Sequence, residues 1–255
     1  MVAALWFNYI MIAVELVNAG YRVNGGKALV KGLSFTIDQG ETLVLLGRSG
    51  SGKTTTLKLI NCLLKPTEGE VRVLGRSTRE WDPIRLRRQI GYVIQEGGLF
   101  PHYTVARNVS LVPELEGWPR ERIDARVKEL MQLIGLPFEE FASRYPHQLS
   151  GGQRQRVGVA RSLAADPPLL LLDEPFGALD PITRRQLQRE FRELQQRLGK
   201  TAVFVTHDVR EAFQLAARIG LLVDGTMVEL CTPDQFLHST HPEVQAFVEC
   251  LKDNF

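Results

Sequence analysis

Residues 47–54 constrain the fold of this chain more than any other segment. They are Gly-Arg-Ser-Gly-Ser-Gly-Lys-Thr and match the pattern G-x-x-x-x-G-K-[ST]. An apolar run, residues 42–46, precedes them, and a helical pattern with apolar Leu57, Ile60 and Leu64 follows. A strand, a glycine-rich turn and a helix form the context in which backbone N–H groups converge on phosphate oxygens. The segment therefore predicts a phosphate-binding loop in an α/β fold.

The residue types inside this loop suit a nucleoside triphosphate with its magnesium ion. Lys53 can reach the β- and γ-phosphates, and the Thr54 hydroxyl can bind Mg²⁺. A glycine-rich turn with a chance lysine is the plain alternative, and the flanking strand and helix weigh against it. We therefore predict Mg-ATP as the ligand. The residues expected to contact it here are Gly47, Arg48, Ser49, Gly50, Ser51, Gly52, Lys53, Thr54 and Thr55.

A second element is an acidic pair at the end of a leucine run. Residues 169–172 are four consecutive leucines, typical of a fully buried parallel strand, and Asp173 and Glu174 follow. Open α/β sheets bind ligands at the carboxyl ends of their strands. We expect Asp173 to hold Mg²⁺ through water and Glu174 to orient and polarise the attacking water. A simple acidic strand end is the alternative, and the phosphate-binding loop elsewhere in the chain favours the functional interpretation.

A third element, residues 149–153, opens another helix with Leu-Ser-Gly-Gly-Gln. Ser150 is a good N-cap, and Gly151 and Gly152 expose backbone N–H groups at a positive helix end, just before Gln153. This would be a second anion site. One chain does not need two phosphate sites for one ATP, so we expect a second copy to supply this site in trans. A capped helix with a flexible entrance remains open as an alternative.

The remaining patterns predict the organisation of the chain. Residues 12–37 alternate like antiparallel strands, the region of about 100–165 is helical, and residues 219–230 form a hairpin around Asp224-Gly225. We expect an α/β core with an N-terminal antiparallel β subdomain, a helical insertion, and a C-terminal hairpin with helices over about 219–255. Residues 1–11 are interpreted as an N-terminal extension or a misassigned start, and residues 12–255 as one domain.

The bulk composition narrows the class of protein. With 31 basic and 29 acidic side chains the formal net charge is +2, which does not suggest a nucleic-acid partner. Three scattered cysteines, Cys62, Cys231 and Cys250, favour a reducing compartment without disulfides. We find no segment long and apolar enough to span a bilayer, so the chain is expected to be soluble by itself.

These three elements, in their order along the chain (residues 47–54, 149–153 and 169–174), resemble those of the ATP-binding subunits of ABC transporters, a group of P-loop NTPases. The resemblance extends almost from end to end of the chain. The family places a glutamine after a strand, a turn ending in aspartate and a histidine after the last core strand, which Gln95, Asp180 and His207 match. The resemblance implies that Gln95 touches Mg²⁺ and the attacking water and reports to a membrane partner. It implies that His207 binds the γ-phosphate and steadies Glu174, that Asp180 belongs to the nucleotide site, and that Tyr21 stacks on adenine.

Within this family, the resemblance is strongest to one group. Residues 91–101, 111–113 and 175–183 are most similar to importer subunits of the osmoprotectant group, which takes up glycine betaine, carnitine or choline. This implies an ATP hydrolase at the cytoplasmic face of the membrane, working as a head-to-tail homodimer with a membrane permease and, indirectly, a soluble substrate-binding protein. Arg48 stands where the family usually has proline, and we expect ATP binding to survive. The chain ends at Phe255, so gating by C-terminal regulatory domains is not expected.

Two rival functions belong to related classes. A soluble ABC ATPase of DNA repair, chromosome organisation or translation would carry long coiled coils, zinc modules or two ATPase halves, and the sequence has none of these features. An exporter subunit is the nearer rival, and the importer-like run at residues 175–183 weighs against it. Neighbouring permease and binding-protein genes would favour import.

Overall fold

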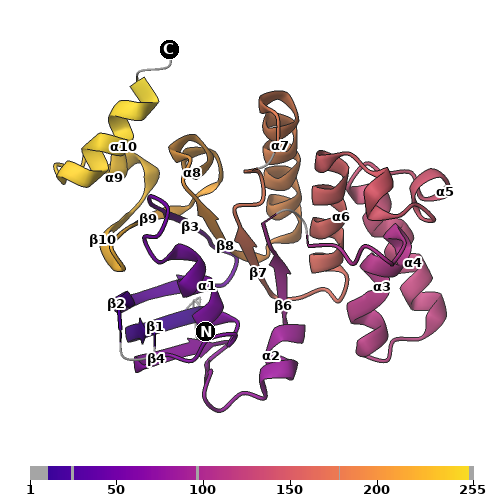
Figure 1. Cartoon of the computed structure of the whole chain (residues 1–255), viewed down its shortest axis with the longest axis horizontal. Helices are drawn as coiled ribbons and strands as arrows, with labels where there is room; N and C mark the ends of the chain where they lie inside the picture. The colour runs from indigo at the N-terminus through magenta and orange to yellow at the C-terminus, as the bar shows by residue number, and fades with distance from the viewer. Residues whose placement is uncertain (1–10, 24–25, 96–97, 178, 253–255) are drawn as a thin grey trace, which may run out of the picture.

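The computed structural model describes residues 11–23, 26–95, 98–177 and 179–252. Residues 1–10 of the predicted extension, which was expected over 1–11, lie outside this range. The sequence Asn-Gly-Gly at residues 24–26 predicts a turn, and its first two residues also lie outside the range. The predicted α/β fold is confirmed. It consists of two sheets with helices between and beside them (Figure 1).

The central sheet carries the strands that were expected to surround the nucleotide. It has six strands in the order β10-β9-β3-β8-β7-β6, and neighbours pair in parallel except β10, which pairs antiparallel with β9. The strands are β3 (Thr42–Leu46), β6 (Ile90–Val93), β7 (Leu169–Asp173), β8 (Thr201–Thr206), β9 (Arg218–Val223) and β10 (Thr226–Cys231). All residues of β3, β7 and β8 are buried, which explains their unbroken apolar runs.

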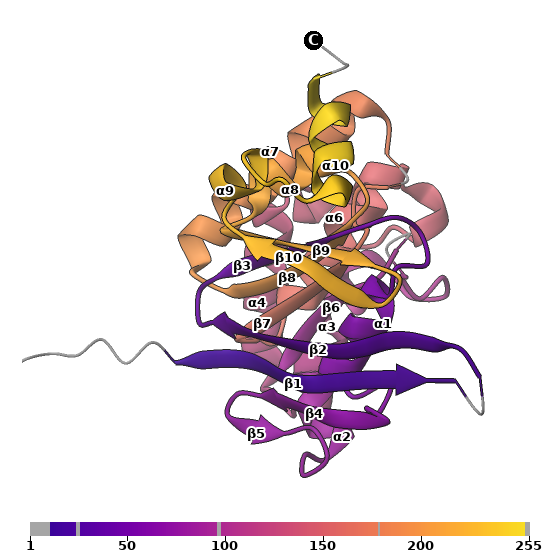
Figure 2. The same ribbon diagram turned by 90° about the vertical axis from the view of Figure 1, so that its left-hand side faces the viewer.

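A second, antiparallel sheet formed mainly by the N-terminal part of the chain packs over one face of the central sheet. Its order is β2-β1-β4-β5. The strands are β1 (Ile12–Arg22), β2 (Ala28–Asp38), β4 (Glu68–Val73) and β5 (Arg76–Ser77). Its buried side chains join those of helix α1 (Lys53–Ile60) and of alternate residues in β3, β7 and β8 in one apolar cluster. Helix α1 therefore lies between the two sheets, and Figure 2 shows β2, β1 and β4 side by side in the second of these sheets.

The other face of the central sheet is covered by helices. Their side chains form a second apolar cluster with the remaining alternate residues of the same strands. The helices along the chain after α1 are α2 (Pro83–Arg88), α3 (Val105–Leu115), α4 (Arg120–Leu133), α5 (Phe138–Phe141), η1 (Pro146–Gln148), α6 (Gly151–Leu163), α7 (Pro181–Leu198), α8 (Val209–Leu215), α9 (Pro233–Leu237) and α10 (Pro242–Lys252). Among the described residues, none of these helices has the length and apolarity that a membrane crossing requires.

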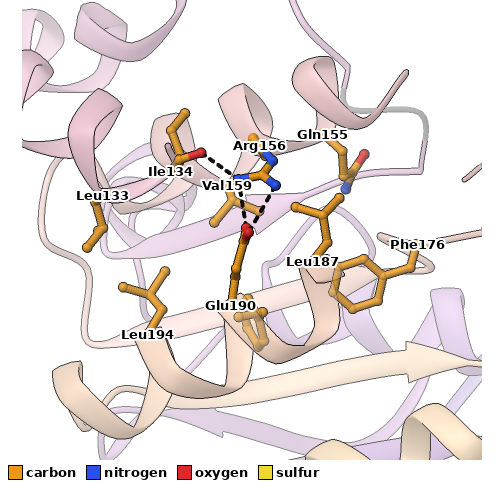
Figure 3. A pocket seen from close by; sticks show the side chains of 10 residues that line it. Leu133, Ile134, Gln155, Arg156, Val159, Phe176, Leu187, Glu190 and Leu194 are labelled. Carbon is orange, nitrogen blue, oxygen red and sulfur yellow. Dashed lines mark hydrogen bonds and ion pairs between the residues drawn. The ribbon is translucent and has the colours of Figure 1, made fainter. Parts of the chain in front are cut away.

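Helix α6 is joined to α4 and α7 by one arginine (Figure 3). The guanidinium group of Arg156 donates to the carbonyl oxygen of Ile134 at 2.8 Å and pairs with both carboxylate oxygens of Glu190, at 2.7 and 3.0 Å. Leu187 and Leu194 of α7 line the same narrow space between the helices. This two-pronged ion pair fixes α6, whose first residues are a predicted anion site, to the helix that follows β7.

Local signals explain most of the boundaries. The sequence predicts a helix over residues 181–198, with Pro181 in its first turn and Gly199 after its last. Helix α7 has these bounds, Asp180 is its N-cap, and Gly199 follows at φ 58°. The predicted hairpin is also present, and its turn residues Asp224 and Gly225 both have positive φ, 48° and 83°.

The sequence pattern predicts a helix over residues 211–218, and the structure shows that these bounds are wrong. The structure has α8 at Val209–Leu215, because Asp208 caps it through the backbone N–H of Arg210. Arg218 instead begins β9, where its guanidinium group holds the Glu41 carboxylate. The ion pair with a distant residue is not visible in the local pattern.

We predict that Phe204→Ala destabilises the protein by about 3–5 kcal/mol, because the ring is fully buried and its loss leaves a cavity. Phe204 of β8 packs at centroid distances of 5.5 and 6.1 Å from Phe176 and Phe191. Urea unfolding measures the free energy of unfolding of this variant and of the control Ile182→Ala. Because Ile182 is 81 % exposed, the control should change the free energy of unfolding by no more than about 0.5 kcal/mol. Similar losses in both variants would contradict the packing described here.

Candidate functional site

The predicted phosphate-binding loop follows β3 and is pressed against two neighbouring strands. A Cβ atom at Gly47 would lie 2.4 Å from the carbonyl oxygen of Leu222, and one at Gly52 would lie 2.6 Å from that of Leu29. Gly52 also has φ 102°, which disfavours other residues. The hairpin tip Gly225 donates its N–H to the carbonyl oxygen of Ser51 at 3.1 Å. Glycine is therefore required at both loop positions because backbone occupies the adjacent space.

Lys53 is fixed in the centre of this loop. Its side chain is buried, and Nζ donates to the carbonyl oxygens of Gly47 and Arg48 at 2.8 and 2.9 Å. Burial lowers the pKa of Lys53, while the nearby charges of Glu174 and Asp173 act in the opposite direction. An ammonium group held beside the first backbone N–H groups of α1 suits an anionic phosphate chain.

Asp173 ends β7 next to the first turn of α1. Its Oδ1 accepts from Thr54 Oγ1 at 2.9 Å, and its Oδ2 accepts from Tyr92 Oη at 3.4 Å. Burial raises the pKa of Asp173, and the two hydrogen bonds oppose that shift. A hydroxyl and a buried carboxylate side by side are hard oxygen donors of the kind that Mg²⁺ prefers, so the residues fit the predicted ion.

Glu174 and His207 meet at the same sheet edge. Oε2 of Glu174 lies 3.2 Å from Nδ1 of His207. Glu174 has φ 45°, a left-handed conformation uncommon outside glycine, and its N–H donates to the carbonyl oxygen of Val205 at 3.0 Å. Strand β7 ends at Asp173, and the backbone turns at Glu174. The Asp173 side chain is therefore buried, whereas that of its neighbour Glu174 is half-buried.

Two further predicted residues lie around this centre. Gln95 is exposed and follows β6, two residues after the pair between Val93 and Leu172 of β7. Tyr21 is half-buried on β1, where it pairs with Val30, and Cγ2 of Val30 would lie 3.6 Å from a Cβ atom at Gly52. Gln95 is therefore placed at the carboxyl edge of the sheet, and Tyr21 one strand away from the loop.

The other loop residues differ in exposure. Ser51 is buried and its hydroxyl has no hydrogen-bond partner within the described part of the chain, whereas Thr55 is half-buried. Ser49 and Gly50 are exposed. Arg48 is also exposed, and its guanidinium group lies 3.7 Å from Glu243 of α10. An exposed pair of this kind contributes little to stability.

The predicted second anion site opens α6. Ser150 Oγ accepts from the backbone N–H of Gln153 at 3.2 Å, and the Ser150 N–H donates to Gln153 Oε1 at 2.9 Å, a complete capping box. A Cβ atom at Gly152 would lie 2.7 Å from Cγ2 of Thr183, so glycine permits close packing on α7. Gly151 is exposed.

This second site is not brought against the loop of the same chain. Leu57 of α1 packs in the cluster between the two sheets, whereas Val157 of α6 packs in the cluster on the opposite face of the central sheet. Asp180 is the N-cap of α7 and accepts from the N–H groups of Ile182 and Thr183 at 3.1 and 3.0 Å. A hydrogen bond with the Thr183 side chain lowers the pKa of Asp180 most, and the bonds from the backbone N–H groups of Thr183 and Ile182 lower it further.

Tyr92 is a further residue of the site that was not predicted from the sequence, although its hydroxyl group donates to Asp173. Tyr92 pairs with Leu171 in the parallel ladder between β6 and β7, and Asp173 is two residues further along β7. Side chains two residues apart in a strand share a face. The alternation could therefore have placed the phenol beside the carboxylate, had the register of the two strands been known.

The loop, the buried strand-end aspartate and the glutamate–histidine pair define a nucleotide-binding domain of the P-loop class. The chain belongs to the ABC transporter family, whose profile matches residues 30–177, more than half of its length. The family resemblance drawn from the motifs is thereby confirmed.

The chain is similar to proteins that are named as ATP-binding proteins of transport or uptake systems. The chain is 51 % identical over 239 residues to the glycine betaine/carnitine/choline transport ATP-binding protein OpuCA of Bacillus subtilis, covering 93 % of this chain and 62 % of that protein. It is 52 % identical over 209 residues to the glycine betaine uptake system ATP-binding protein YehX of Escherichia coli, covering 82 % and 68 %. The chain thus spans less than two thirds of the length of OpuCA.

A solved structure supports the fold. The dimeric ATP-binding cassette MJ0796, in a post-hydrolysis state bound to ADP and Pi, matches with a TM-score of 0.77 at 38 % identity. The match covers 86 % of this chain and 98 % of that one.

We predict opposite pH effects for two aspartates. Because the folded-state pKa of Asp173 is raised above its ordinary 3.8, the wild type should lose stability relative to Asp173→Asn as pH rises from about that value. Because the pKa of Asp180 is lowered, the wild type should lose its advantage over Asp180→Asn as pH falls below 3.8. Urea unfolding from pH 3 to 7 measures both differences. Slopes of the same sign in the two variants would contradict the described environments.

Proposed function

We propose that this chain binds and hydrolyses ATP as a subunit of an ABC importer and powers uptake of a small quaternary ammonium osmoprotectant through a separate membrane permease. The observation that carries the ATPase proposal is the meeting of Lys53, the Thr54–Asp173 pair and the Glu174–His207 pair at one sheet edge. The solute class is supported by the names of the relatives, which mention glycine betaine, carnitine and choline.

In this proposal each side chain has one task. Lys53 and the loop N–H groups bind the phosphates, and Thr54, Asp173 and Gln95 would hold Mg²⁺. When bound, that ion neutralises charge on the phosphate oxygens. Glu174 orients the attacking water and accepts its proton, while His207 fixes the Glu174 carboxylate and contacts the γ-phosphate.

A second copy of the chain would complete the site. The capping box at residues 150–153 presents backbone N–H groups at a helix end, and it lies on the face of the central sheet opposite α1. Such a group serves the γ-phosphate of a partner's nucleotide when two copies pair head to tail. The dimeric cassette MJ0796 with ADP and Pi supports this arrangement. Asp180 and Tyr21 would lie beside the same nucleotide.

The permease is proposed to dock beside Gln95. Strand β6 is an edge of the central sheet, and a surface cavity of about 300 Å³ lies between it and α3. The exposed side chains of Ile94 and Phe100 belong to this cavity, as does the half-buried Leu111. An apolar hollow at the sheet edge suits an inserted segment of another protein. Docking there would hold the subunit at the cytoplasmic face of the membrane, with a substrate-binding protein on the other side.

The ATPase proposal is tested with Glu174→Gln. We expect ATP binding to remain, because the loop contacts do not involve Glu174, and hydrolysis to fall by about two orders of magnitude or more through loss of the water-orienting carboxylate. The variant should also accumulate as an ATP-bound dimer in size-exclusion chromatography with light scattering.

The matched control is Glu193→Gln on an exposed position of α7, which should hydrolyse ATP like the wild type. Hydrolysis by Glu174→Gln close to the wild-type rate would remove Glu174 from the chemistry.

A further inference from the structure

Glu211 is a buried carboxyl group that none of the roles above uses. It lies on α8 and is 4 % exposed. Its Oε2 accepts from Thr206 Oγ1 at 2.5 Å, and its Oε1 accepts from Gln188 Nε2 at 2.9 Å. Burial raises the pKa of Glu211, and these two hydrogen bonds oppose the shift. Burying a carboxyl group is unfavourable, so its two specific partners suggest a positional task.

The hydroxyl group of Thr206 connects this carboxyl group to the turn that carries His207. Thr206 is the last residue of β8 and is 2 % exposed. Besides donating to Glu211, its Oγ1 accepts from the backbone N–H of Asp208 at 3.0 Å. One hydroxyl group therefore ties the residues before and after His207 together. A hydroxyl that donates and accepts at once is restricted to one orientation.

The His207 side chain is exposed, so its position depends on the backbone turn that carries it. Its side chain is 60 % exposed, so packing does little to fix the imidazole ring. The ring reaches Glu174 Oε2 at 3.2 Å only if the backbone places it there. The turn is further held from α7, since Nη1 of Arg184 lies 3.7 Å from Oδ2 of Asp208.

We propose that Glu211 is a positioning residue for His207 and acts through the Thr206 hydroxyl, while Gln188 of α7 holds its second carboxylate oxygen. The proposal rests on the ATPase function, in which His207 fixes the Glu174 carboxylate. Without the hydroxyl group or its acceptor, the turn is released and the imidazole leaves Glu174. This slows the chemical step and spares nucleotide affinity, because the loop contacts described above do not involve these three residues.

Two matched pairs of variants test it. Thr206→Val removes the hydroxyl at nearly constant shape, whereas Thr206→Ser keeps it. Glu211→Leu removes the acceptor, whereas Glu211→Gln keeps an oxygen for Thr206 and lets the Gln188 amide turn to face it. We expect Thr206→Val and Glu211→Leu to lower kcat by about 10- to 100-fold with KM for ATP changed less than about threefold. Thr206→Ser and Glu211→Gln should stay within about threefold of the wild-type kcat.

A spectroscopic readout separates positioning from stability and from the ATPase proposal itself. The ring nitrogen-15 chemical shifts of His207 should change in Thr206→Val and Glu211→Leu and remain at wild-type values in the two conservative variants. Circular dichroism confirms folding of each variant. Unchanged His207 shifts in folded Thr206→Val and Glu211→Leu would overturn the proposal, whatever the ATPase rates. If the wild type fails to hydrolyse ATP, the proposed function fails, and the shifts alone still decide whether Glu211 positions His207.

Discussion

The parallel alignment of β3, β8 and β7 is the constraint on which the candidate site depends. Leu46 pairs with Thr206, and Val205 pairs with Asp173. Because parallel strands end at the same edge, the loop, the acidic pair and His207 meet there. The hydrogen bond between Thr54 and Asp173 closes this arrangement across 119 residues of sequence. A shift of one residue in register would turn Asp173 to the other face of the sheet and break it.

The alternation along the strands also separates the residues that face α1 from those that face the helices on the other side of the central sheet. In β7, Leu171 faces α1 and the antiparallel sheet, whereas Leu172 faces the helices on the other side. Asp173 continues the first face and therefore meets Thr54. Thr206 of β8 continues the other face, as Phe204 does, and meets Glu211 of α8. One pleated sheet thus positions the phosphate-binding residues from one side and the His207 turn from the other.

Much of this could be predicted from sequence because the decisive signals are local. The loop at residues 47–54, the leucine run before Asp173 and the caps of α7 each lie in a few consecutive residues. The sequence did not reveal Tyr92 or Glu211, whose partners are brought near only by strand register and helix packing. The position of α8 was also predicted wrongly, because the ion pair between Arg218 and Glu41 joins residues that are far apart in the sequence. The roles proposed for Tyr21, Gln95 and Asp180 stay predictions.

In the proposed dimer, each ATP site is shared by two copies of the chain. Lys53→Ala should disable the loop of its own chain, and Ser150→Arg should block the capping-box helix end. Each variant alone should therefore lack a complete site, whereas a mixed dimer contains one intact loop facing one intact helix end. The decisive measurement is the ATPase rate of the two variants before and after mixing. If each site is shared, mixing restores hydrolysis; activity that remains at the level of the separate variants would show that the site is not shared.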